Sequence, residues 1–289
     1  MATLKTENLT KVYPNGVKAL DNVSIEISNG MFGLLGPNGA GKSSLMRTLA
    51  SLQEADSGTA FLNDIDILNN PLALRKVLGY LPQEFGVYPK ITAEQLLDHI
   101  SILKGITNSK ERKELVSYLL QKVNLYEQRN KSVKGFSGGM KQRVGIAQAL
   151  IGNPQLIIVD EPTAGLDPGE RNRFHNLLAD VGQDVIIILS THIVDDVREL
   201  CSNMAIMNLG QIVYKGTPNN VLEEIKGQVW QKSIERNQVV EYQQNYKVIS
   251  DKMVAGNPLI HILSETNPGN GFEQVEPNLE DVFFTKING

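Results

Sequence analysis

Short hydrophobic runs alternate with helical patterns along most of the chain. Val23, Ile25 and Ile27 are separated by polar residues, and this alternation predicts a strand with one buried face. Residues 156–159 and 185–189 are continuously apolar, as is typical of strands that are buried on both faces of a parallel sheet. Because such strands alternate with helical segments, we predict an α/β fold with a mostly parallel sheet.

Residues 78–134 have a helical composition. Within this stretch, a capping-box pattern at Thr92 and Gln95 predicts the start of a helix. The same helix is expected to end near Leu103. The segment is therefore predicted to consist mainly of helices.

Two further helices are predicted from their capping signals. The first takes Asn108 or Ser109 as its N-cap and buries Leu115, Leu119, Leu120 and Val123. The other begins at an N-cap, a proline and a capping-box acid, which are Asp167, Pro168 and Glu170. It is expected to end near Gly182.

The character of the sequence changes at about Gly227, where a polar stretch begins. We expect a small α+β appendage over residues 227–289, following a larger domain over residues 1–226. Its predicted elements are weak alternation at residues 229–234, an apolar run at 259–263, a turn at 267–271 and a closing helix at 277–287.

The composition is that of a globular protein: of 289 residues, 41% are hydrophobic and 21% are charged. The 28 lysine and arginine residues are outnumbered by 32 acidic residues, which gives a formal net charge of −4. No nucleic-acid partner is expected, because proteins that clamp nucleic acid are distinctly basic. The single cysteine, Cys201, excludes an intramolecular disulfide and a cysteine-cluster metal site, and it favours a reducing compartment.

The sequence predicts neither a secretory signal nor a membrane-spanning segment. Residues 1–7 contain no apolar run. The longest purely aliphatic run, at residues 185–189, is far shorter than the roughly 20 residues needed to cross a bilayer. We therefore expect any membrane role to depend on a partner.

The segment from Gly36 to Ser43 fits the GxxxxGK[ST] pattern of a phosphate-binding loop. Apolar residues 31–35 precede it and a helical pattern follows Gly41, so the loop has its required strand and helix. Glycines let backbone N–H groups turn toward a phosphate, Lys42 would reach the β- and γ-phosphates, and Ser43 would hold Mg²⁺. The alternative is a glycine-rich turn that binds no ligand. The predicted nucleotide-binding residues of this segment, together with the residue that follows it, are Gly36, Pro37, Asn38, Gly39, Ala40, Gly41, Lys42, Ser43 and Ser44.

Two acids, Asp160 and Glu161, follow the predicted strand at residues 156–159. Ligands of open α/β sheets bind at the carboxyl ends of the strands. Asp160 is suited to hold Mg²⁺ through water, and Glu161 to orient or deprotonate an attacking water. An isolated Asp-Glu pair would more often be a solvated strand end, but here the phosphate-binding loop is predicted in the same sheet.

Residues 136–143, Phe-Ser-Gly-Gly-Met-Lys-Gln-Arg, resemble the signature loop of ATP-binding cassette (ABC) ATPases. In that family the loop precedes the acidic pair by about 20-odd residues, and Ser137 lies 23 residues before Asp160. Ser137 can cap a helix whose amides face a phosphate. Within the family this loop, here with Ser137, Gly138 and Gly139, binds ATP held by the opposite subunit. The resemblance therefore implies a head-to-tail nucleotide sandwich of two copies.

The resemblance spans roughly residues 2–226 and implies a fold for them. This fold is a P-loop NTPase core with a mostly parallel sheet, an antiparallel β subdomain, and an inserted helical subdomain at about residues 84–152. The small α+β appendage follows at the C-terminus. The implied cofactors are ATP and Mg²⁺.

Four further segments resemble elements of the family. Tyr13 resembles the aromatic that stacks on adenine, although a strand-edge tyrosine is the alternative. Gln83 resembles the glutamine that senses the γ-phosphate and Mg²⁺, and it joins Ser43 and Asp160 in the implied metal site. His192 resembles the switch histidine that contacts the γ-phosphate, while residues 165–167 resemble the loop that communicates between subunits. The implied catalytic residues are Glu161, His192, Lys42 and Gln83.

Two residues depart from the pattern of the signature loop. Phe136 stands where leucine is usual, which exchanges one buried residue for another. Met140 stands where glutamine is commonest, which removes a polar side chain beside the phosphate-facing amides and puts the ATP affinity of that site in doubt.

The C-terminal segment indicates a branch of the family. Residues 277–284 resemble the closing segment of subunits that energise ABC-2-type exporters, and residues 83–89 are also similar to that branch. The alternative for 277–284 is an amphipathic closing helix with Leu279, Val282 and Phe283 packed inward.

The expected function is that of an ATP-hydrolysing motor subunit of an exporter, in which two copies drive a separate transmembrane permease. We expect it on the cytoplasmic face of the cell membrane. A soluble ABC ATPase in a non-transport process is the alternative, but the DNA-repair type needs a coiled coil for which the separation of 118 positions from Lys42 to Asp160 leaves no room. A regulatory binder without turnover would have been favoured by the loss of Glu161 or His192, and both are present.

Overall fold

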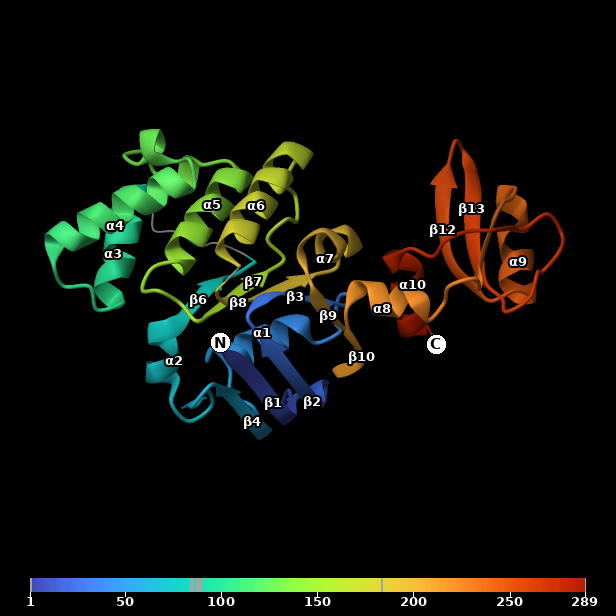
Figure 1. Ribbon diagram of the computed structural model, residues 1–289, viewed down its shortest axis with the longest axis horizontal. Coiled ribbons are helices and arrows are strands. Elements are labelled where there is room, and N and C mark those ends of the chain that lie inside the picture. Colours follow the sequence, from blue (N-terminus) through green and yellow to red (C-terminus); the bar gives the residue numbers. More distant parts are fainter. Residues whose placement is uncertain (1, 84–85, 87–89, 183, 289) are drawn as a thin grey trace.

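The computed structural model describes residues 2–83, 86, 90–182 and 184–288 (Figure 1). Its strands are β1 Thr3–Val12, β2 Lys18–Ser28, β3 Gly30–Leu35, β4 Ser57–Leu62, β5 Ile65–Asp66, β6 Leu78–Leu81, β7 Leu156–Asp160, β8 Ile186–Thr191, β9 Asn203–Asn208, β10 Gln211–Gly216, β11 Val229–Ser233, β12 Val248–Val254, β13 Asn257–Leu263 and β14 Glu273–Gln274. Its helices are α1 Lys42–Leu49, α2 Pro71–Val77, α3 Ala93–Leu103, α4 Ser109–Lys122, α5 Gly138–Ala149, α6 Pro168–Val181, α7 Val194–Leu200, α8 Pro218–Glu223, α9 Val239–Asn245 and α10 Leu279–Asn288.

The central sheet has the strand order β10-β9-β3-β8-β7-β6. All neighbours in it run parallel except β10, which is antiparallel to β9. Ile157 and Ile187 pack on one face, in the core cluster that contains α5 to α7. Ile158 and Ile188 pack on the other face, against α1. Both faces are thus buried, which explains the continuous apolar runs and confirms the predicted α/β fold.

A second sheet, with the order β2-β1-β4-β5, is antiparallel and covers α1 (Figure 1). In β2 the side chains of Val23, Ile25 and Ile27 are buried and the residues between them are exposed. The predicted one-sided strand is confirmed. The alternation arises because only one face of this sheet meets the core.

Helices α3 and α4 pack against each other and against α5. The capping box at Thr92 is present, and the N-cap of α4 is Asn108 rather than Ser109, because its side chain accepts from the backbone N–H groups of Lys110 and Glu111. Of the residues expected to be buried by α4, Leu115 is only half-buried, and Val116 fills the core instead.

One part of the predicted helical segment is a strand. Residues 78–81 form β6, which pairs in parallel with the open edge of β7. Gly79 makes room for α5, since a Cβ there would overlap the Ala149 carbonyl. Of residues 83–89, only Gln83 and Gly86 are described, so the similarity noted for that segment lies largely outside the described residues.

Helix α6 begins and ends where its signals predict, with Asp167 as N-cap, Pro168 in the first turn and Gly182 as C-cap. The expected capping-box bond of Glu170 is absent from the described contacts of this helix, so that detail was wrong. Its carboxylate instead lies 2.6 Å from the Arg173 guanidinium. The Arg143 guanidinium lies 3.4 Å from the same carboxylate, so two arginines draw the Glu170 side chain away from the backbone N–H of Asp167.

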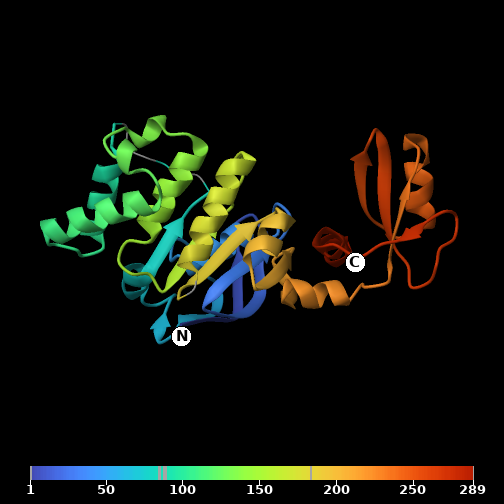
Figure 2. The same cartoon turned by 45° about the horizontal axis from the view of Figure 1, so that its top comes forward.

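The segment after Gly227 forms an antiparallel sheet of order β12-β13-β11-β14 with α9 and α10 (Figure 2). The closing helix begins at Leu279, two residues later than expected. Its side chains Val282 and Phe283 are buried in the same core cluster as Val197 of α7 and Val221 of α8. Helix α10 therefore joins the C-terminal sheet to the larger, N-terminal part of the chain.

Candidate functional site

The three loops that carry most of the predicted chemistry leave adjacent strands. β3, β8 and β7 are neighbours and run parallel, so their carboxyl ends meet at one edge of the sheet. The loop after β3 leads to Lys42, β7 ends in Asp160 and is followed by Glu161, and His192 follows β8. This topology brings together residues up to 150 positions apart in the sequence.

The loop between β3 and α1 has a shape that requires glycine. Gly39 and Gly41 have positive φ angles of 82° and 106°. A Cβ at Gly41 would overlap the Ala19 carbonyl, and a Cβ at Gly36 would lie 2.5 Å from the Met207 carbonyl oxygen. The backbone therefore turns sharply between packed segments and ends at the first turn of α1, where free N–H groups favour an anion.

Lys42 is folded back over this loop. Its Nζ donates to the carbonyl oxygens of Gly36 and Pro37, at 2.7 and 3.1 Å, and only 5% of the residue is exposed. Burial lowers the pKa of Lys42, while the carboxylates of Glu161 and Asp160 oppose that shift. The ammonium is thus held at the loop in a position where phosphate oxygens could replace the carbonyl oxygens as its partners.

Glu161 is the residue on which the other predicted groups converge. Its Oε1 lies 3.7 Å from the Nζ of Lys42 and 3.2 Å from the Nδ1 of His192, and its Oε2 accepts from the Nε2 of Gln83 at 3.2 Å. The backbone φ of Glu161 is 47°, which is uncommon for a residue other than glycine. Its carboxylate is therefore held from three sides by groups on different loops.

Asp160 is suited to a divalent cation. The residue is 4% exposed, and its Oδ1 has no hydrogen-bond partner in the described part of the chain. Burial raises the pKa of Asp160, and the nearby Ser43 hydroxyl and Lys42 ammonium act in the opposite direction. A buried carboxylate oxygen without a donor, beside a serine hydroxyl, matches the hard oxygen ligands that Mg²⁺ takes.

We expect Asp160→Asn to raise the melting temperature of the nucleotide-free chain at pH 7. A raised pKa means that the folded state disfavours the carboxylate relative to the unfolded state. The unfavourable free energy of the buried carboxylate is present when the pH is above the pKa of Asp160 in the folded state. It fades as the pH falls through that pKa. Thermal unfolding at a series of pH values should therefore show that the rise in melting temperature becomes smaller as the pH is lowered.

Asp56→Asn is the matched control, because Asp56 accepts from the Val12 N–H and its pKa is lowered by that bond. Its substitution should bring no gain in melting temperature. A fall in melting temperature for Asp160→Asn at pH 7 would contradict the assigned penalty.

A cavity of about 420 Å³ lies beside the glycine-rich loop and includes Tyr13, Gln83 and Glu161 in its lining. The Tyr13 hydroxyl lies 3.0 Å from the Ser44 Oγ and donates to Gln53 at 2.8 Å, so this aromatic ring stands beside the loop. Apolar side chains at the same cavity include those of Val17, Ala19 and Leu209. The cavity thus combines an apolar part with a phosphate-binding loop, as a nucleotide requires.

The Ser-Gly-Gly segment stands apart from this cavity. Ser137 is the N-cap of α5 and accepts from the Met140 N–H at 3.2 Å. Gly139 packs so closely on Glu170 of α6 that a Cβ there would overlap the carboxylate. Among the described residues that line the cavity, none belongs to this segment, whereas Ser137 and Gly138 are exposed.

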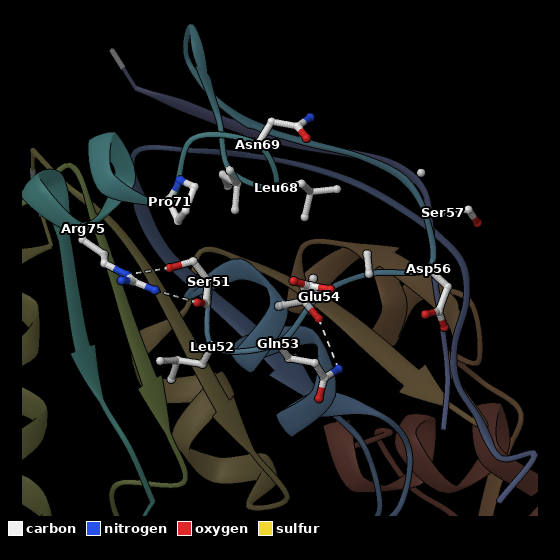
Figure 3. Close-up of a pocket in the computed structure, with 14 residues that line it drawn as sticks. Ser51, Leu52, Gln53, Glu54, Asp56, Ser57, Leu68, Asn69, Pro71 and Arg75 are labelled. Carbon is white, nitrogen blue, oxygen red and sulfur yellow. Dashed lines mark hydrogen bonds between the residues drawn. The ribbon is translucent and has the colours of Figure 1, made fainter. Parts of the chain in front are cut away.

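A larger cavity, of about 620 Å³, lies between the end of α1 and the start of α2 (Figure 3). Arg75 bridges it by donating to the Oγ and the carbonyl oxygen of Ser51, both at 3.1 Å. Its described lining contains none of the predicted site residues. Gln53 of its lining is the hydrogen-bond partner of Tyr13, which lines the first cavity.

The sequence patterns assign no role to His175 and do not predict its contacts. Its Nε2 lies 2.9 Å from the Oδ1 of Asp196, a fully buried carboxylate one turn after His192. The sequence carried a weak signal for Asp196 only. An acid a few residues after His192, the predicted catalytic histidine, is a candidate for positioning that histidine.

Residues 20–164 match the family model described as ABC transporter. The chain is 37% identical over 226 residues to an uncharacterized ABC transporter ATP-binding protein, YxlF, of Bacillus subtilis (strain 168), which covers 78% of this chain and 73% of that protein. It is 31% identical over 272 residues to a probable multidrug ABC transporter ATP-binding protein, YbhF, of Escherichia coli (strain K12). That alignment covers 89% of this chain, so it extends past residue 226, and the chain spans about half of YbhF (47%).

The fold is similar to that of the ATP-binding cassette MJ0796, which was solved as a dimer in a post-hydrolysis state bound to ADP and Pi. The TM-score is 0.68 at 26% sequence identity, over 74% of this chain and 98% of that one. Among the described residues, no helix has the length and apolar character needed to span a membrane.

Proposed function

The chain belongs to the ABC transporter family as an ATP-binding subunit with ATPase activity, and from this membership we propose that it is the homodimeric motor of an exporter. The observation that carries the proposal is the convergence of Lys42, Gln83 and His192 on Glu161. Such an arrangement holds one carboxylate beside the glycine-rich loop, within reach of a water that attacks the γ-phosphate of a nucleotide bound there.

In the proposed reaction, ATP binds with its phosphates on residues 36–44 and its adenine on the Tyr13 ring. Glu161 orients and deprotonates the attacking water, and His192 holds both this carboxylate and the γ-phosphate. Lys42 compensates the charge of the β- and γ-phosphates.

The group that Ser43, Gln83 and Asp160 are proposed to hold is Mg²⁺, which supplies charge neutralisation to the phosphates. The partnerless Oδ1 of the buried Asp160 supports this assignment. Gln83 contacts Glu161 directly, so it is placed to link the cation site to the proposed general base.

The second half of each ATP site is proposed to come from another copy of the chain. Ser137, Gly138 and Gly139 supply bare amides at the start of α5, away from the described lining of the nucleotide cavity. Because one chain carries both halves intact, two copies can form two equivalent sites about a twofold axis. The dimeric state of the similar cassette MJ0796 supports this assembly.

Transport is proposed to take place in a separate transmembrane permease, with the subunit on the cytoplasmic face of the cell membrane. The similarity to YbhF, a probable multidrug transporter subunit, supports the exporter branch. The closing segment at residues 277–284 supports it too, although α10 also fills the core as an ordinary amphipathic helix. A soluble, non-transport ATPase stays the alternative.

Co-expression with a candidate transmembrane permease tests the proposal. We expect the chain to sediment with membranes that contain this protein, and its ATPase rate in washed vesicles to change several-fold when the membrane protein is present. Membranes from cells that lack the membrane protein are the control. Equal sedimentation and equal rates in both preparations would favour the soluble alternative.

A further inference from the structure

A buried carboxylate outside the nucleotide cavity lies behind the proposed catalytic residues. Asp196 belongs to α7, and none of its surface is exposed. Burial of an unpaired carboxylate is very unfavourable, so a charge in this place needs several donors. Both of its oxygens have such partners, and they come from different segments of the chain.

The Oδ2 of Asp196 contacts two loops at once. The Thr163 hydroxyl donates to it at 2.6 Å and the Thr191 hydroxyl at 3.2 Å. Thr163 lies two residues after Glu161, and Thr191 lies directly before His192. One oxygen atom therefore joins the two loops that carry the proposed base and its histidine partner.

The Oδ1 of Asp196 is occupied by α6. It accepts from the Nε of Arg171 at 2.8 Å and lies 2.9 Å from the Nε2 of His175. Helices α6 and α7 cover the same face of the sheet (Figure 1). Because the guanidinium compensates the charge at this oxygen, Oδ2 is left to the two neutral hydroxyls.

Thr191 links the Asp196 carboxylate to the segment that carries His192. Its hydroxyl donates to Asp196 and also accepts from the Ile193 N–H at 2.9 Å. His192 lies between these two attachment points. Its side chain is 46% exposed, so the segment around it, rather than packing of the ring, determines where the imidazole lies.

We propose that Asp196 is a positioning residue, which sets the placement of Glu161 and His192 relative to each other through Thr163 and Thr191. The proposal rests on the roles given above to Glu161 and His192. The two side chains are 3.2 Å apart, and each projects from a loop that leaves its strand one residue earlier. A shared anchor is needed because a catalytic group displaced by about 1 Å can lose about a hundredfold in rate.

The test replaces the two hydroxyls by groups of the same shape. We expect Thr163→Val and Thr191→Val each to lower kcat about tenfold. KM for ATP and the equilibrium affinity for ATP should stay within about twofold, because the phosphates are held by residues 36–44. Thr163→Ser and Thr191→Ser keep the hydroxyl and should restore kcat to the unmodified value. If either valine variant does not fold, the corresponding alanine variant takes its place, with the same fall in kcat expected.

Thr6→Val is the matched control. Thr6 is equally buried, and its hydroxyl likewise donates to an acceptor, the Val23 carbonyl, and accepts from the Ile25 N–H. It lies in the antiparallel sheet, away from the described contacts of Glu161. A comparable loss of melting temperature with an unchanged kcat is expected.

Three results would overturn the proposal: an unchanged kcat in both valine variants, a rise in KM alone, or the same loss of kcat in Thr6→Val. A fall in kcat that the serine variants do not restore would also contradict it. Failure of the proposed function is recognised separately, because the unmodified chain would then hydrolyse ATP no faster than a reaction without protein.

Discussion

Glu161→Gln is expected to hydrolyse ATP at least about a hundredfold more slowly than the unmodified chain while it still binds the nucleotide, because the amide cannot accept the proton of the attacking water. The glutamine side chain has the same shape and can keep its contact with Gln83. Binding should persist because the phosphate contacts come from the loop at residues 36–44.

Single-turnover hydrolysis of bound ATP is the measurement, since it reports the chemical step without product release. Glu54→Gln is the control, because Glu54 lines the neighbouring larger cavity and should leave the rate unchanged. Hydrolysis by Glu161→Gln at the unmodified rate would show that another group activates the water.

The parts of the site that the sequence predicts are those whose chemistry is local. A phosphate-binding loop needs glycines at fixed spacing, and Gly39 and Gly41 have the positive φ angles that explain why. The strand that ends in Asp160 is predictable because both faces of β7 are buried, which makes its run continuously apolar. In each case one physical requirement acts on neighbouring residues.

Features that depend on distant partners leave weaker traces in the sequence. Strand β6 forms because β7 offers it an edge, and no pattern within residues 78–81 distinguishes it from a helix. Asp195 and Asp196 are adjacent, but only the second meets Arg171 of α6 and becomes buried. The position of α6 decides which of the two aspartates is buried. The residues next to them in the sequence do not determine that position.

The C-terminal sheet is an intermediate case. The hairpin of β12 and β13 turns at Ala255 and Gly256, which both have positive φ angles of 48° and 90°. Alanine is uncommon in such a turn, where asparagine or aspartate would have given a clear signal. The closing helix α10 is amphipathic and could be predicted, whereas its contact with α7, the helix after His192, could not.

The second large effect concerns assembly. With ATP and Mg²⁺, Glu161→Gln should become dimeric, because the uncleaved γ-phosphate joins the loop of one copy to the Ser137 segment of the other. Adding Ser137→Arg should abolish this dimer, since Ser137 is exposed at the start of α5 and an arginine would obstruct the amides there.

Substitution of Ser137 also removes a helix N-cap, which costs about 1 kcal/mol in stability. Asn108→Arg provides the control, because it places the same side chain at the N-cap of α4 and removes a cap of the same kind. It should lower stability to a similar extent and leave the dimer intact.

Light scattering after size exclusion of Glu161→Gln tests the central claim, that ATP is enclosed between two copies, most directly. The nucleotide sandwich predicts the mass of a dimer with ATP and Mg²⁺, the mass of a monomer with ADP, and the mass of a monomer with ATP once Ser137→Arg is added. A dimer that forms equally with ADP and survives Ser137→Arg would place the interface elsewhere and contradict the sandwich.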